Sequence, residues 1–106
     1  MNSRVKTILA ELRSRLERLY GDRLVKLVLY GSQARGDAES DSDIDVLVVL
    51  KGPVQVGTEI ERGSTVTAPL SLEHDVVISC VYVPEDRYKR DRSPLLLHVE
   101  AEGVPV

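Results

Sequence analysis

The residues that could do chemistry gather in one polar segment, Gly31 to Asp45. Its carboxylates occupy alternate positions from Asp37 to Asp45, directly before an apolar stretch. Residues i and i+2 of an extended chain point to the same face, so we expect Asp43 and Asp45 side by side at the start of a strand. Two carboxylates that close repel each other unless a cation lies between them. Oxygen ligands of this kind suit Mg²⁺, which binds through one or two carboxylates plus substrate phosphates.

Other phosphate and metal motifs do not fit this segment. Gly31 and Gly36 have the spacing that begins a P-loop, but Asp37 and Ala38 occupy the positions of its Lys and its Ser or Thr. The EF-hand, zinc and dinucleotide-binding patterns fail at their glycine or ligand positions. The segment therefore needs a different explanation.

What remains is Gly31-Ser32, ten residues, then Asp43-x-Asp45, with a further acid, Asp75, before the next apolar strand. This pattern resembles the signature of the DNA polymerase beta-type nucleotidyltransferase superfamily. The local sequence Gly-Ser-x-Ala-Arg-Gly…Ser-Asp-Ile-Asp is similar to that of the minimal members of this superfamily. These are the MntA-like proteins that are paired with HEPN-domain toxins. The resemblance covers most of the chain.

The resemblance implies a role for each matching residue. Gly31 would let the backbone approach the triphosphate of ATP, and Ser32 would hydrogen-bond its oxygens. Asp43 and Asp45 would bridge two Mg²⁺ ions. Asp75 would complete the metal site and help to take the proton of the acceptor hydroxyl. Two metals of this kind stabilise the attacking and leaving oxygens of an in-line displacement, here at the α-phosphate with pyrophosphate leaving.

Arg35 follows the Gly-Ser pair and is placed to meet phosphate charge in an ATP-binding site. An outward-facing surface arginine is the alternative for this residue.

The function implied by the resemblance is protein adenylylation. With 106 residues, we expect one minimal nucleotidyltransferase domain over residues 1–106 and an acceptor hydroxyl on another macromolecule. The family then implies transfer of AMP from ATP to a tyrosine of a partner HEPN toxin, which neutralises the toxin. Two alternatives stay open: a binding-only antitoxin that masks its partner, and nucleotidyl transfer to RNA or a small molecule.

Composition and charge narrow the classes of protein. The net charge is −3 and aromatic residues make up 4%, which argues against direct nucleic-acid binding. Residues 1–26 hold seven of the 14 Lys and Arg but three of the 17 acids, so this stretch is either a docking surface for a partner or a solvated face.

The longest apolar run, Val46 to Leu50, is far too short for a membrane span. The lone Cys80 fits a reducing compartment, so we expect a cytoplasmic protein.

Hydrophobic spacing predicts an α/β (α+β) fold, and the resemblance makes it a polymerase beta-like one, a small mixed sheet flanked by helices. A helix is predicted up to Gly21, and a short helix can begin after Gly31. A segment at 54–73 is ambiguous because Gly63 and Pro69 weaken its helical pattern. The charged run 85–92 is predicted as a loop or turn. The remaining predicted elements are strands at 24–30, 44–50 and 75–83, a helix from Pro94 to about Glu102, and a last short strand.

Overall fold

The computed structural model describes residues 2–39 and 42–106. The elements in chain order are α1 (Ser3–Tyr20), a 3-10 turn η1 (Gly21–Arg23), β1 (Leu24–Tyr30), α2 (Ser32–Arg35), β2 (Ile44–Leu50), α3 (Val56–His74), β3 (Ile78–Pro84), α4 (Glu85–Arg90), α5 (Pro94–Glu102) and β4 (Val104–Pro105). Within the described ranges, no helix combines the length and the apolar character that a membrane span requires.

Four strands form one mixed sheet in the order β3-β2-β1-β4. β1 runs antiparallel to β2 and β4, whereas β2 and β3 run parallel. This register places Asp45 between Tyr30 on β1 and Ser79 on β3. Side chains of laterally paired residues share one face of a sheet, so these three point the same way. The predicted α/β class and the small mixed sheet are confirmed.

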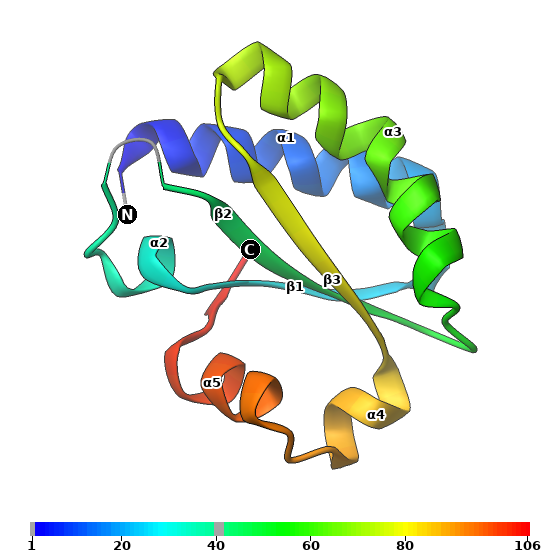
Figure 1. The fold of residues 1–106 in the computed structure, drawn as a ribbon. Helices are drawn as coiled ribbons and strands as arrows, with labels where there is room; N and C mark the ends of the chain where they lie inside the picture. The colour runs from blue at the N-terminus through cyan, green and yellow to red at the C-terminus, as the bar shows by residue number, and fades with distance from the viewer. Residues whose placement is uncertain (1, 40–41) are drawn as a thin grey trace.

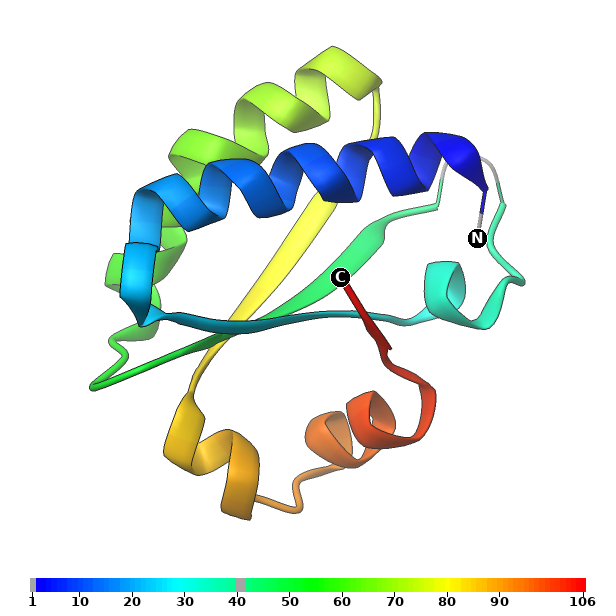
Figure 2. The same cartoon turned by 180° about the vertical axis from the view of Figure 1, so that it is seen from behind.

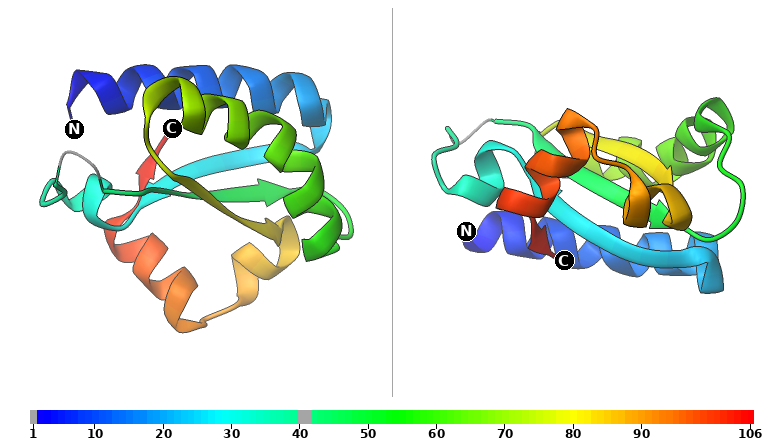
Figure 3. Two further views of the ribbon diagram at one scale, coloured as in Figure 1. Left: turned by 45° about the horizontal axis from the view of Figure 1, so that its top comes forward. Right: turned by 90° about the horizontal axis from the view of Figure 1, so that it is seen from below.

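Helices cover both faces of the sheet: α1 and α3 lie on one face, and α4 and α5 lie on the other (Figures 1 and 2). Seen from below, α4 and α5 stand in front of the sheet (Figure 3). Alternate residues of β2 enter the two cores, with Val46 under α1 and α3 and Leu47 under α5. A central strand that is buried on both faces has a continuous run of apolar residues. The run from Val46 to Leu50 is such a sequence, and it predicted this strand.

The ambiguous segment forms one helix, α3, in spite of its glycines and Pro69. Packing decides the outcome, because Val66 and Leu70 are buried against the sheet and tertiary contacts outweigh weak propensity. Ile60 on the same helix is 54% exposed. Gly63 is the close-contact position: a Cβ there would lie 1.8 Å from the Tyr82 hydroxyl oxygen.

The prediction of a loop or turn over residues 85–92 is wrong, because α4 occupies most of this segment. Glu85 pairs with Lys89 at 3.4 Å, and Asp86 pairs with Arg90 at 3.2 Å, both four residues apart. An acid one turn before a base supports a helix. Tyr88 packs against the core cluster that contains Leu96 and Val99 of α5. This contact holds the short helix against the sheet, and the many charged residues around Tyr88 gave no sign of it.

We expect Gly63→Ala to lower the free energy of unfolding by about 1–3 kcal/mol, because the new methyl group overlaps the Tyr82 hydroxyl. Gly57→Ala is the matched control in the same helix, since a Cβ at that position meets no atom within 4 Å. It should stabilise the protein by up to about 1 kcal/mol through helix propensity. Urea unfolding of both variants checks this, and a Gly63→Ala variant as stable as the control would contradict it.

Candidate functional site

The Asp45 carboxylate is fitted against the backbone of Gly31, the residue that follows β1. Gly31 has φ +77°, and a Cβ built on it would lie 2.6 Å from Asp45 Oδ2. Any other residue would be strained by the positive φ and would also displace the carboxylate. Gly31 therefore makes room for Asp45, a role that is visible only once β1 and β2 are paired.

Asp43 lies just before β2 and is exposed, whereas Asp45 on β2 is partly buried. Burial raises the pKa of the Asp45 carboxyl, and the nearby charge of Asp43 raises that pKa further. The two carboxylates therefore interact, as the alternate spacing predicts. A divalent cation would relieve both the repulsion and the lost hydration, so this pair fits a metal. Asp41, another of the alternating acids, lies outside the described residues.

The predicted short helix after Gly31 is α2, and Ser32 is its first residue. Figure 1 shows α2 at the end of the sheet where β1 ends and β2 begins. Gln33 is buried, and its Nε2 donates to the Ser42 carbonyl at 3.2 Å. This bond ties α2 to the residue before Asp43. Sequence reasoning missed Gln33 because a single polar residue in a polar segment carries no pattern.

Arg35 at the end of α2 makes two ion pairs. Its Nη1 lies 3.0 Å from Glu102 Oε2 on α5, and its Nε lies 3.2 Å from Asp37 Oδ2. Hydrogen bonds to these carboxylates, that to Glu102 first, raise the pKa of the Arg35 guanidinium. The side chain thus links α2 to α5, and any phosphate that it binds must compete with Glu102.

Asp75 lies in the turn between α3 and β3, where it ends the helix with φ +50°. The predicted strand from Asp75 to Val83 is wrong at its start, because β3 begins at Ile78. Ser71 explains the difference: its carbonyl accepts the N–H groups of Asp75 and Val76, a helix-end arrangement that closes α3. The β3 residue beside Asp45 is Ser79, which the sequence did not suggest. The role of Asp75 stays a prediction.

A pocket of about 220 Å³ lies between the end of β1, α2 and α5. Tyr30 and Gly31 line one side, and Leu95 and His98 line the other. Burial, followed by the charge of Asp45, raises the pKa of the Tyr30 hydroxyl. The pocket is therefore next to the acidic pair through the paired residues Tyr30 and Asp45.

A second group of possible metal ligands, Glu11, Glu73 and His74, lies between α1 and α3. The Arg15 guanidinium stands 3.4 Å from Glu73 and 3.9 Å from Glu11, and His74 Nε2 lies 3.1 Å from Glu11. Arg15 already supplies the positive charge that a metal ion would bring. This cluster is an ion-pair network that joins two helices.

Residues 9–96 match the family model of the nucleotidyltransferase domain. The chain belongs to this family. It is 30% identical over 100 residues to a Methanocaldococcus jannaschii protein named "putative protein adenylyltransferase", with 93% of this chain and 95% of that protein covered. The family resemblance and the nucleotidyltransferase enzyme class predicted from the sequence are confirmed.

Solved structures share the fold. A toxin–antitoxin structure with AMP-PNP superimposes with a TM-score of 0.63 at 20% identity, covering 89% of this chain and 68% of that one. A nucleotidyltransferase of Sulfolobus solfataricus, itself described as "putative", gives a TM-score of 0.61 at 20% identity over 99% of this chain and 86% of that one. The chain therefore has the fold expected from the sequence, the polymerase beta-like nucleotidyltransferase fold with a small mixed sheet flanked by helices.

The raised pKa of Asp45 predicts a stability cost at neutral pH. Its ordinary value is 3.8, and ionising the carboxyl costs more in the folded state than in the unfolded one. The stabilising contribution of the protonated form, complete below pH 3.8, is lost as the pH rises through the folded pKa. Asp45→Asn should therefore gain stability over the natural chain at pH 7, and that gain should disappear at pH 3.

Urea unfolding in EDTA across this pH range checks the prediction. Asp22→Asn is the control, because Asp22 is exposed and should change stability little at any pH. An Asp45→Asn variant with no gain at pH 7 would mean that the fold accommodates the Asp45 charge without cost.

Proposed function

We propose that this nucleotidyltransferase transfers AMP from ATP to a tyrosine hydroxyl of a partner toxin, and so acts as an antitoxin. The observation that carries the proposal is the interacting pair Asp43 and Asp45 beside Gly31 and Ser32. The relative named as a protein adenylyltransferase supports the protein acceptor. The structural neighbour, a toxin–antitoxin structure with AMP-PNP, supports the nucleotide and the partner.

In this proposal Asp43 and Asp45 would hold two Mg²⁺ ions, which when bound would stabilise negative charge on the attacking and leaving oxygens. The tyrosine oxygen forms a bond to the α-phosphorus while the bond between that phosphorus and the β-phosphate oxygen breaks. Pyrophosphate leaves with the electron pair of that bond. The hydroxyl proton passes to a carboxylate, for which Asp75 is the proposed acceptor.

The proposed nucleotide lies along α2 with its nucleoside in the pocket lined by Tyr30 and His98. Ser32 at the start of α2 hydrogen-bonds the phosphate oxygens. Arg35 reaches the same oxygens after exchanging its bond to Glu102 for one to phosphate. This exchange trades one charge-assisted hydrogen bond for another, so it costs little.

The proposed partner is a HEPN-domain toxin that supplies the tyrosine, and the proposed site of action is the cytoplasm. Arg13 and Arg15 on α1 are engaged with Glu17 and Glu73, whereas Arg18 is exposed. The basic character of residues 1–26 is thus partly neutralised within the fold. This arrangement favours a protein partner over the phosphate backbone of a nucleic acid.

The test uses α-labelled ATP, Mg²⁺ and the product of the adjacent gene as acceptor. Label should appear on the partner, and Asp43→Ala/Asp45→Ala should reduce the rate by at least about a hundredfold, because the charge stabilisation of the transition state is lost. Asp22→Ala/Glu61→Ala is the matched control, since both acids are exposed and lie outside the site. Labelling that survives in the Asp43 and Asp45 variant would overturn the assignment.

A partner that co-purifies with the chain but takes no label from any nucleotide would instead identify a binding-only antitoxin. Label on RNA or on a small molecule would assign a different acceptor class to the same acidic pair.

The third acid has its own test. If Asp75 takes the proton, Asp75→Asn should lower the single-turnover rate by at least about a hundredfold and leave ATP binding unchanged. Ser79→Ala should then change the rate less than about tenfold. The opposite order would assign the third position to Ser79, which the strand register places beside Asp45.

A further inference from the structure

Another pocket lies at the end of the sheet far from Asp45. Its volume is about 570 Å³, and it opens between the start of β1, the end of β2 and the start of α3. The β1–β2 register runs from Leu24↔Leu50 at this end to Tyr30↔Asp45 at the other. Six residues of extended chain span about 20 Å, so this pocket is separate from the acidic pair.

Three cationic side chains line the pocket, Arg23, Lys51 and Arg62, against one carboxylate, Glu59. The pocket therefore carries two positive charges in excess, although the whole chain has a net charge of −3. Charge of this sign, gathered in a concave site of an acidic protein, selects an anion.

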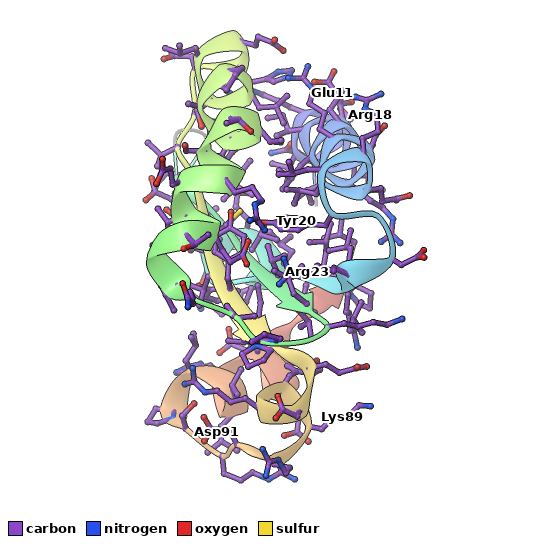
Figure 4. All side chains as sticks on the ribbon, turned by 90° about the vertical axis from the view of Figure 1, so that its right-hand side faces the viewer. Glu11, Arg18, Tyr20, Arg23, Lys89 and Asp91 are labelled. Atoms are coloured by element: carbon purple, nitrogen blue, oxygen red, sulfur yellow. The ribbon has the colours of Figure 1, made fainter. Side chains whose placement is uncertain are left out.

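Glu59 holds the two arginines in place. It is 3% exposed, and it accepts hydrogen bonds from Tyr20 Oη at 3.0 Å, Arg23 Nη2 at 3.2 Å and Arg62 Nη1 at 3.1 Å. Arg23 also donates to the carbonyl oxygens of Lys51 and Pro53 and stands 5.7 Å above the Tyr20 ring. Figure 4 shows Tyr20 and Arg23 reaching from the α1–β1 junction toward α3. The guanidinium groups are thus fixed before any ligand arrives.

The pocket keeps hydrogen-bond donors that the fold does not use. Within the described residues, the Lys51 ammonium has no ion pair, and Arg62 engages Glu59 through Nη1 alone. A purely structural network would account for Arg23, Glu59 and Arg62, but it gives no role to Lys51. None of the eight lining residues is aromatic, so the pocket has no ring on which a base could stack. The remaining donors suit phosphate oxygens, because guanidinium and ammonium groups form their strong hydrogen bonds with such anions.

We infer that this pocket binds the phosphate groups of a small anion, with diphosphate as the chemistry that it fits, at a site distinct from the acidic pair. The inference does not rest on the proposed adenylylation. Arg23 and Arg62 would contact the anion from the side where Glu59 holds them. Lys51, the residue after β2, adds the third positive charge. Free diphosphate and the phosphate chain of a nucleotide share this chemistry.

The test measures pyrophosphate binding to the full chain by isothermal titration calorimetry, in EDTA so that the acidic pair holds no metal. Lys51→Ala and Arg62→Ala should each weaken binding by about tenfold, the value of one charge-assisted hydrogen bond. Arg18→Ala is the matched control, because Arg18 is exposed on α1 and outside the pocket. Binding should also weaken as salt is raised.

Lys51→Ala is the decisive variant, because the Lys51 ammonium has no ion pair among residues 2–39 and 42–106. The variant should therefore unfold at the same urea concentration as the natural chain. No binding by the natural chain, or equal binding by Lys51→Ala and Arg18→Ala, would overturn the inference. A loss of binding in Asp43→Ala/Asp45→Ala would also overturn it by placing the ligand at the acidic pair.

Two further probes identify the source of the phosphate groups. ATP bound as tightly as pyrophosphate, with the same dependence on Lys51, would support recognition of the phosphate chain alone. Binding of a polyglutamate peptide in place of pyrophosphate would overturn the inference in favour of an acidic protein partner.

Discussion

The antiparallel pairing of β1 with β2 is the constraint on which the rest of the structure depends. The same register that sets Tyr30 opposite Asp45 brings Gly31 against the Asp45 carboxylate. At the other end it brings Arg23 to the carbonyl oxygen of Lys51. A slip of one residue would turn the apolar side chains of β2 to the wrong faces, so the two cores hold both ends of the sheet in place.

The core stabilises a site that is itself unfavourable. Asp45 carries a carboxyl whose pKa is raised by burial and by Asp43, so its charge costs free energy at neutral pH when no cation is bound. β2 can carry that cost because it is central, hydrogen-bonded on both sides and buried on both faces. Groups held near one another at a cost are typical of functional sites, and here the cost falls on a strand that is buried and paired on both sides.

Local patterns predicted most elements and the acidic pair. Helix periodicity, apolar strands and the spacing of Gly-Ser and Asp-x-Asp all depend on residues that are close together in the sequence. Some of the failures depend on contacts between distant segments, and others on local bonds that residue types alone do not reveal. Nothing near Arg35 indicates that Glu102, from α5, will meet it. Ser71 lies only four residues before Asp75, but the residue types do not show that its carbonyl will accept the Asp75 N–H and end the helix there. The basic pocket joins Arg23 of η1 to residues of α3 and of the segment between β2 and α3, so no short window of sequence contains it. The helix α4 could have been predicted from the sequence, because its acids precede its bases by four residues.

The fit of Gly31 against Asp45 also limits the order in which these positions can change during evolution. An ancestor with aspartate at position 45 accepts only glycine at position 31, for two reasons. A side chain at position 31 would collide with the Asp45 carboxylate, and a residue other than glycine would be strained at φ +77°. Loss of the acid removes the first obstacle and leaves the second. In a lineage that loses the proposed activity, Asp43 and Asp45 are therefore expected to vary first, while the glycine at position 31 remains.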